Sequence, residues 1–143
     1  MALALAEAEA AGARGEVPVG AVIVDEAGTV IGRAGNRVEA DADPTAHAEL
    51  LAIRQACAAL GTARLVGCDL YVSLEPCPMC AQAIAFARIR RLYYGAEDAK
   101  GGGVDHGARI FDRSSCHHRP EVYGLIGAAP AAALLKAFFA ARR

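Results

Sequence analysis

Two stretches decide the fold of this chain: Pro44-Thr45-Ala46-His47-Ala48-Glu49 and Pro76-Cys77-Pro78-Met79-Cys80. One imidazole and two thiols form a three-ligand zinc set, which leaves the fourth tetrahedral position open to water. An open position is typical of a catalytic metal site, so we predict that His47, Cys77 and Cys80 bind Zn²⁺. Glu49 lies two residues after the histidine, close enough to reach that water without binding the metal. We predict that it is the catalytic proton carrier.

The length and composition of the chain predict one compact domain over residues 1–143. Hydrophobic residues make up 55% of the sequence, which is sufficient for a core, and the formal net charge is only −1. This balance excludes a chain disordered by composition and a general polyanion binder. The charge is unevenly placed, because residues 1–71 hold five Arg and ten acids, whereas residues 72–143 hold eight Arg, two Lys and six acids. We therefore expect any nucleic-acid surface in the second half.

The cysteines and the first residues indicate where the protein resides. Five cysteines is an odd number, and a Cys-x-x-Cys beside a histidine-bearing helix fits metal ligation in a reducing compartment better than a disulfide framework. The stretch 1–13 is apolar, but it carries Glu7 and Glu9 and has no basic region before it. It is too short and too charged for a signal peptide or a membrane span. We expect a cytoplasmic protein with no membrane segment.

The order of the predicted elements indicates an α/β fold. We expect helices over residues 2–14, 46–60, 77–86 and 130–142, a short helical stretch near 108–112, and strands over 17–24, 29–36, 69–74, 91–95 and 121–126. Strands that alternate with helices predict a sheet covered by helices on both faces. Two helix starts that each follow a strand would bring His47, Glu49, Cys77 and Cys80 to one edge of that sheet. The unpaired N–H groups at such a start favour an ionised Glu49.

The combination of motifs is more specific than either motif alone. A lone Cys-x-x-Cys also fits a structural zinc half-site or a redox pair. Together, His-x-Glu and Pro-Cys-x-x-Cys form the signature of zinc-dependent nucleobase deaminases, in which the glutamate is not a ligand. Zinc lowers the pKa of its bound water to roughly 7, which makes hydroxide available at neutral pH. Glu49 would take that proton, deliver it to a ring nitrogen and later protonate the departing amine.

A wider set of residues resembles the bacterial tRNA-specific adenosine deaminase (TadA) family, over almost the whole chain. The resemblance implies a cytidine-deaminase-like, three-layer α/β/α fold with a five-stranded mixed sheet, and a homodimer. It also implies zinc-dependent conversion of the wobble adenosine in the anticodon loop of an arginine tRNA to inosine. The stretches that carry it are Glu16-Val17-Pro18-Val19-Gly20-Ala21, Gly35-Asn36-Arg37, Asp43 to Glu49, Leu74-Glu75-Pro76-Cys77, Gly95-Ala96-Glu97-Asp98-Ala99-Lys100 and Ala132 to Phe139.

The resemblance also implies substrate contacts. Asn36 would hydrogen-bond the flipped base, Val19 and Ala48 would line its pocket, and Asp98 would contact the neighbouring nucleotide backbone. Taken without the family, Asn36 fits a turn at a strand end and Asp98 fits a solvated loop acid. Glu75 is expected to brace a loop and not to touch the substrate. The stretch 101–107 departs from the family pattern.

Several other features have simpler interpretations. Arg88, Arg90 and Arg91 suit the dipole at a helix end and solvation. Cys57 and Cys68 are expected to be small buried residues, and Cys116-His117-His118 lacks a spaced fourth ligand for a second metal. Phe138-Phe139 is interpreted as core plus one ring on the substrate side. The candidates for an RNA-facing edge are His117, His118, Arg119, Arg142 and Arg143.

Two other functions compete with RNA editing at this stage. A deaminase of free bases or nucleosides, of guanine or cytosine type, would carry the same metal motif and need no RNA surface. A non-enzymatic zinc or thiol-redox module would leave Glu49 without a role. Substrate preference separates the first alternative from editing, and any deaminase turnover excludes the second.

Overall fold

A five-stranded mixed sheet forms the middle layer of the structure, a computed structural model that describes residues 1–143. Its strands lie in the order β2-β1-β3-β4-β5. β1 pairs antiparallel with both β2 and β3, whereas β3, β4 and β5 run parallel to one another. This confirms the predicted mixed sheet. The strand bounds are β1 Gly20–Val24, β2 Val30–Gly35, β3 Asp69–Leu74, β4 Arg91–Ala96 and β5 Glu121–Tyr123.

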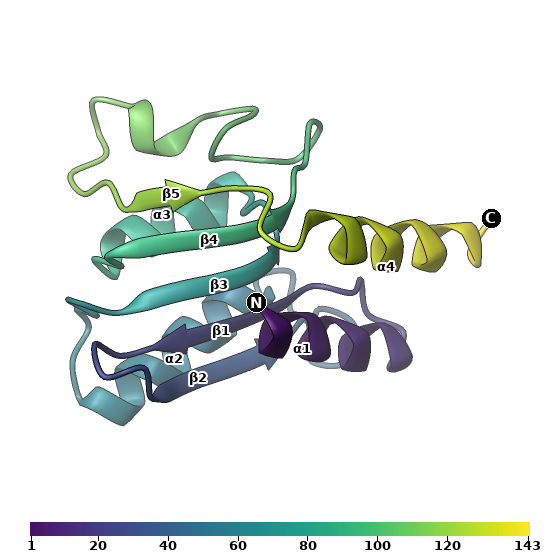
Figure 1. The fold of residues 1–143 in the computed structure, drawn as a ribbon, viewed down its shortest axis with the longest axis horizontal. Helices are drawn as coiled ribbons and strands as arrows, with labels where there is room; N and C mark the ends of the chain where they lie inside the picture. The colour runs from purple at the N-terminus through teal and green to yellow at the C-terminus, as the bar shows by residue number, and fades with distance from the viewer.

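Helices cover both faces of the sheet and complete the predicted three layers (Figure 1). α1 (Ala2–Ala13) and α4 (Ala128–Ala140) lie on one face, and α2 (Ala48–Leu60) and α3 (Pro78–Phe86) lie on the other. A single 3₁₀ turn, η1 (Ile110–Asp112), follows the long loop after β4. Because β3 and β4 are parallel and joined through α3, their carboxyl ends point to the same edge of the sheet. The helices α2 and α3 begin at that edge.

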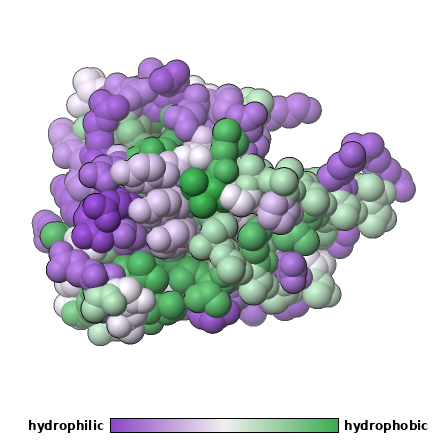
Figure 2. All heavy atoms as spheres, viewed as in Figure 1, coloured by the Kyte–Doolittle hydropathy of each residue, from purple (hydrophilic) through white to green (hydrophobic).

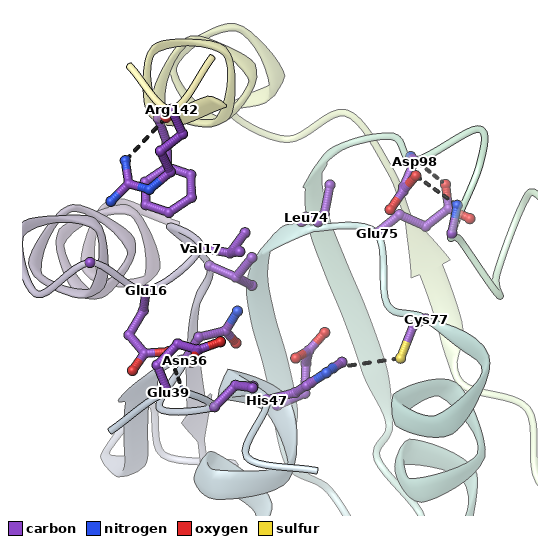
Figure 3. Close-up of a pocket in the computed structure, with 16 residues that line it drawn as sticks. Glu16, Val17, Asn36, Glu39, His47, Leu74, Glu75, Cys77, Asp98 and Arg142 are labelled. Carbon is purple, nitrogen blue, oxygen red and sulfur yellow. Dashed lines mark hydrogen bonds between the residues drawn. The ribbon is translucent and has the colours of Figure 1, made fainter. Parts of the chain in front are cut away.

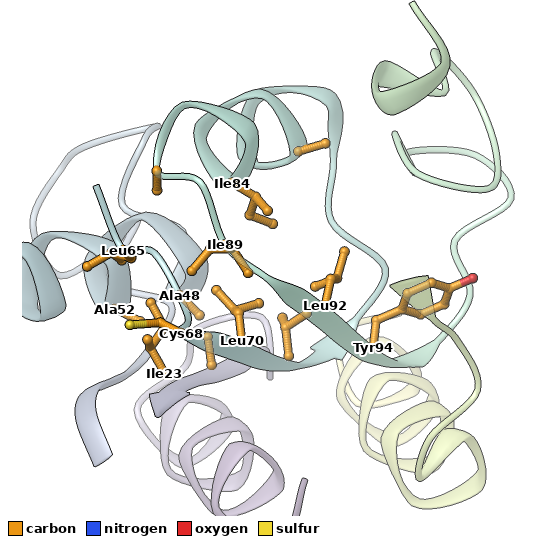
Figure 4. Close-up of a cluster of buried hydrophobic side chains, with 14 of the residues drawn as sticks. Ile23, Ala48, Ala52, Leu65, Cys68, Leu70, Ile84, Ile89, Leu92 and Tyr94 are labelled. Carbon is orange, nitrogen blue, oxygen red and sulfur yellow. The ribbon is translucent and has the colours of Figure 1, made fainter. Parts of the chain in front are cut away.

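The main hydrophobic core lies between the sheet and the pair α2 and α3 (Figure 4). Leu70 and Leu92 project from the two central strands, and Ile84 reaches them from α3, all three fully buried. The opposite face is packed by small residues instead. At Gly20 an added Cβ would lie only 2.1 Å from the Ala4 carbonyl oxygen, so α1 rests almost directly on the backbone of β1.

Several element boundaries differ from the predictions: β1 begins at Gly20 instead of 17, and α4 spans Ala128–Ala140 instead of 130–142. α2 begins at Ala48 instead of 46, because His47 keeps an extended backbone and serves as the N-cap residue. Asp43 does not cap this helix, since its Oδ1 accepts hydrogen bonds from the N–H and hydroxyl of Thr45 in a local turn. β5 ends at Tyr123, three residues earlier than predicted, where the chain turns towards α4.

The surface seen from the side of α1 and α4 is divided by hydropathy (Figure 2). Apolar residues gather over α1, β1 and β2, whereas polar residues occupy the opposite edge, where the loops after β4 and the turn η1 lie. None of the helices combines the length and apolar character needed to cross a lipid bilayer.

Candidate metal centre and active-site cavity

The predicted metal ligands meet where α2 and α3 begin. His47 is the N-cap residue of α2, Cys77 is the N-cap residue of α3, and Cys80 lies in the first turn of α3. The Nδ1 atom of His47 lies 3.6 Å from the Sγ atom of Cys77 and 3.5 Å from the Sγ atom of Cys80. The donor atoms of all three residues lie within 4.8 Å of one another. The structure therefore brings together the set predicted from spacing.

These distances fit a tetrahedral zinc ion. Zinc–sulfur bonds of about 2.3 Å and zinc–nitrogen bonds of about 2.0 Å at tetrahedral angles place nitrogen and sulfur about 3.5 Å apart. The observed separations match this value without any movement of the backbone. No other group of three His, Cys, Asp or Glu residues is arranged to hold a metal ion.

The local electrostatics favour deprotonation of one thiol. Hydrogen bonding from the Cys80 thiol, helped by His47, lowers the pKa of Cys77 to about 4. The hydrogen bond with Cys77 raises the pKa of His47. The pKa of Cys80 moves upward, because the neighbouring Cys77 and burial both disfavour a second thiolate. Metal binding therefore requires Cys80 to release a proton, which a divalent cation promotes.

Glu49 lies in the first turn of α2 and is 3% exposed. Its Oε2 atom is the only buried side-chain oxygen or nitrogen in the chain without a hydrogen-bond partner. Burial raises the pKa of Glu49 to about 7. An unpartnered buried carboxylate oxygen is costly, and such atoms in native structures usually serve a function or meet an absent ligand. Glu49 lines the same cavity as His47 and Cys77.

Two of the metal ligands, His47 and Cys77, open onto a cavity of about 640 Å³ (Figure 3). This volume lies in the range of small-molecule sites and is large enough for one nucleobase with its sugar. Its walls come from six parts of the chain: the segment before β1, the loop after β2, the start of α2, the end of β3 with the following turn, the loop after β4, and the carboxyl end of α4. The residues at its wall include Val17, Val19, Asn36, Leu74, Asp98, Gly101, Phe138 and Arg142.

Three of the four residues predicted to contact the substrate lie at the cavity wall, and one does not. Asn36, Val19 and Asp98 line the cavity. Ala48 is fully buried and does not line it. Instead, the backbone N–H of Ala48 donates to the Oδ1 atom of Asn36 at 2.8 Å, so this residue fixes the orientation of the Asn36 amide.

Arg88, Arg90 and Arg91 were all expected to interact with the dipole at a helix end, but the structure gives them different partners. Arg90 forms two hydrogen bonds to the carboxylate of Asp69, and Arg91 donates to Glu121, so both join strands instead of ending a helix. Only Arg88 acts at the end of α3, where it donates to the Ala85 carbonyl. Its backbone adopts a positive φ of 61°, which is uncommon for a residue with a side chain.

The proposed RNA-facing residues also separate in space. Arg142 lies at the cavity, with its guanidinium 3.4 Å from the centre of the Phe138 ring. Arg119 pairs with Asp112, and His118 lies 2.7 Å from the Ile89 carbonyl, before the amino end of β4 and away from the metal ligands. Phe138 is partly buried and lines the cavity, as predicted for one ring on the substrate side, whereas Phe139 is 47% exposed, so the predicted core position of the second ring was wrong.

Sequence reasoning missed the part of Glu16 in the cavity wall. This residue is 2% exposed, and its carboxylate accepts the backbone N–H groups of Glu39 and Ala40. It thereby holds the loop after β2, which forms one side of the cavity. The only sequence signal was a carboxylate directly before an apolar strand.

Comparison with known proteins agrees with this geometry. Residues 1–96 match the family described as the cytidine and deoxycytidylate deaminase zinc-binding region. The chain is 57% identical over 143 residues to a tRNA-specific adenosine deaminase from Agrobacterium fabrum, covering 100% of this chain and 93% of that one. The corresponding protein of Bacillus subtilis is 43% identical, with 95% of this chain and 84% of that one covered. This chain belongs to the tRNA-specific adenosine deaminase family.

Solved structures extend the comparison. A structure from a study of A-to-I editing by tRNA deaminases at the wobble position superposes with a TM-score of 0.92 and 58% identity, covering 94% of this chain and 97% of that one. A guanine deaminase from Nitrosomonas europaea superposes with a TM-score of 0.82 at 26% identity, covering 96% and 81%. The cytidine-deaminase-like fold is therefore confirmed. The chain is a zinc-dependent deaminase in which His47, Cys77 and Cys80 are positioned to bind one metal ion.

Proposed function

We propose that this deaminase converts the wobble adenosine of a tRNA anticodon loop, expected to be that of an arginine tRNA, to inosine and releases ammonia. The observation that carries the chemistry is the unpartnered, buried Oε2 atom of Glu49 beside the three ligand atoms, in a cavity that fits one base. The identity to tRNA-specific relatives over the whole chain supports the substrate.

The residues of the site have different roles in the reaction. His47, Cys77 and Cys80 would hold zinc, which when bound supplies a Lewis acid that makes hydroxide available near neutral pH. Glu49 receives a proton of the water and passes it to a ring nitrogen of adenine; it then takes the proton of the hydroxyl added at C6 and passes it to the departing amine. The hydroxyl group adds at C6 and the amine leaves as ammonia, so the carbonyl of inosine remains.

Asn36 would hold the base through its amide nitrogen. Its Oδ1 atom already accepts the N–H of Ala48, so only the Nδ2 donor is free for a ligand. A purine edge presents ring nitrogens that accept such a donor. Val19 supplies an apolar surface at the cavity wall, and Ala48 acts through its backbone.

The charges at the mouth suit an RNA whose base enters while its phosphates stay outside. Arg142 lies at the cavity, and Lys100 is exposed in the loop that carries Asp98. Phosphate contacts by such cations contribute much of the affinity for nucleic acid. Asp98 would contact the backbone of the nucleotide next to the flipped base.

A deaminase of free guanine is the second candidate. A guanine deaminase from Bacillus subtilis is 48% identical over the superposed region, although that region covers only 66% of this chain with a TM-score of 0.63. Its metal site would perform the same chemistry on a free base, without Arg142 or Lys100 taking part.

The deciding experiment offers both substrate classes to the zinc-loaded protein. An anticodon stem-loop with adenosine at the wobble position, the same stem-loop with cytidine there, free guanine and free adenosine are incubated separately, and products are followed by mass. We expect inosine only from the first RNA. Turnover confined to free purines would replace editing with the second candidate.

We further propose that residues 1–143 act as a single deaminase domain, as a homodimer, in the cytoplasm. One sheet and one main core cluster support the single domain. Phe86 is 68% exposed at the end of α3, and burial against a second copy would remove this apolar surface from water. Five free cysteines support a reducing compartment. Sedimentation of the purified protein tests the dimer.

A further inference from the structure

Glu75 is a fully buried carboxylate that lies between the end of β3 and the metal ligand Cys77. Its Oε2 atom accepts the backbone N–H groups of Val104, Asp105 and His106 at 3.3, 3.0 and 3.0 Å. Its Oε1 atom accepts the N–H of Asp98 at 3.1 Å and lies 2.7 Å from Nδ1 of His106. Because a carboxylate only accepts, the imidazole Nδ1 must donate.

All five donors belong to one segment, residues 98–106, which we name the glycine loop. Its glycines permit the close approach to Glu75. An added Cβ at Gly102 would lie 2.4 Å from Oε2 of Glu75, and one at Gly103 would lie 2.5 Å from the backbone nitrogen of Pro78. The N–H of Gly103 also donates to the Pro76 carbonyl at 2.8 Å. The glycine loop is thus attached to the turn that carries Cys77.

The glycine loop brings Asp98 and Gly101 to the wall of the cavity (Figure 3). The Oδ1 atom of Asp98 accepts the N–H groups of Lys100 and Gly101, at 3.2 and 2.8 Å. Its backbone N–H is held by Glu75, so the residue is fixed at both ends. The Oδ2 atom of Asp98 accepts no hydrogen bond from the protein, so it stays free to bind a ligand.

We infer that Glu75 and His106 are positioning residues, which fix the glycine loop so that Asp98 and Lys100 meet the RNA on the rim of the cavity. This inference rests on the proposed RNA substrate. Glu75 lies at the cavity wall, but the glycine loop occupies both of its carboxylate oxygens, and neither residue belongs to the metal-ligand set. His106 is the accessible half of the pair, since its side chain is 32% exposed whereas that of Glu75 is fully buried. Loss of the pair should therefore weaken RNA binding and leave zinc in place.

Three variants separate positioning from general stability. Glu75→Gln replaces one acceptor oxygen with an NH₂ group. This group would face the N–H donors of the glycine loop, so the loop must move. His106→Ala removes one donor at a partly exposed position and is the safer variant for folding. His106→Asn is the conservative rescue, because its Nδ2–H can occupy the place of the imidazole Nδ1–H. Asp69→Asn is the matched control: it breaks a buried carboxylate's bonds to Arg90 at the far end of the sheet.

The zinc content, the melting temperature and the steady-state constants for the adenosine stem-loop are measured for each protein. We expect KM to rise roughly tenfold or more for Glu75→Gln and roughly threefold to tenfold for His106→Ala. For His106→Asn we expect KM within about twofold of the wild-type value. Zinc should remain at one ion per chain throughout. Asp69→Asn should lower the melting temperature with KM unchanged.

Amide hydrogen exchange gives a second reading that needs no RNA. The N–H groups of Val104, Asp105 and His106 should exchange at least roughly tenfold faster in His106→Ala than in the wild type, while the core strands stay protected. Unchanged exchange, or lower melting temperatures with an unchanged KM, would overturn the inference. A wild-type protein that does not deaminate the stem-loop would instead refute the proposed function, and exchange would still judge whether the pair holds the loop.

Discussion

Replacing Glu49 by Gln is the most informative single change, because it removes the charge and the proton-carrying oxygen while keeping the shape of the side chain. The ligands His47, Cys77 and Cys80 are untouched, so the variant should still bind one zinc ion. Proton transfer by a positioned carboxylate contributes about 10²- to 10⁴-fold to a rate. We expect kcat to fall by at least that factor, with KM for the stem-loop almost unchanged.

The same substitution should stabilise the metal-free protein at neutral pH. Burial raises the pKa of Glu49 from 4.5 to about 7. An acid whose pKa is raised on folding binds its proton more tightly in the folded state, so stability is lost as the pH rises from its unfolded pKa through its folded one. One pKa unit corresponds to about 1.4 kcal/mol, so the wild type loses about 2 to 3 kcal/mol between pH 5 and pH 8 through this group. Gln carries no charge and escapes this loss.

The assay combines two measurements on metal-free and zinc-loaded protein. Urea unfolding of the metal-free proteins at pH 5 and pH 8 gives the difference in unfolding free energy between variant and wild type, and inosine formation gives turnover. Glu39→Gln is the control, since it makes the same change at an exposed carboxylate on the cavity wall. A Glu49→Gln enzyme within tenfold of wild-type turnover would refute the proton-carrier role. An equal free-energy difference at both pH values would refute the burial argument.

Three further outcomes follow from the geometry. Removing zinc with a chelator should abolish turnover and lower the melting temperature, and added zinc should restore both; a chelated protein that keeps its activity would exclude the metal site. Asn36→Ala should lower kcat/KM for the stem-loop by roughly tenfold to a hundredfold with zinc retained, which metal analysis and kinetics check. Gly32→Ala should lower the free energy of unfolding in urea by about 1 to 3 kcal/mol, because the added Cβ would lie 2.4 Å from the Ala52 carbonyl oxygen of α2. An unchanged free energy of unfolding would contradict that contact.

The metal site could be predicted from the sequence because its geometry follows from local rules. Each ligand stretch stands at a helix start, and the interval between His47 and Cys77 holds the remainder of one helix and one strand. β2 and β3 run in the same direction on either side of β1 and are joined through α2, so the second stretch returns to the same sheet edge. The chemistry of the residues identified the metal, and the fold needed only to bring them together.

Features that depend on distant partners could not be predicted in the same way. Arg90 was interpreted from its place after a helix, yet its partner Asp69 lies 21 residues earlier on the neighbouring strand. The start of α2 was placed two residues early, because Asp43 resembles a cap but satisfies Thr45 instead. Local patterns give no measure of which of two competing hydrogen bonds is formed.

The cavity wall also depends on residues that are distant in the sequence, so it could not be predicted from local patterns. Its construction separates the chemistry of the site from substrate recognition. The metal ligands and Glu49 lie on the two helix starts, which the core between α2, α3 and the sheet holds in place. The rim is formed by parts that reach the site from elsewhere: the glycine loop held by Glu75, the loop held by Glu16, and Arg142 at the end of α4. Both loops depend on single buried carboxylates. Because these attachments do not involve the metal ligands, the rim can change its substrate preference while the hydrolytic centre stays the same.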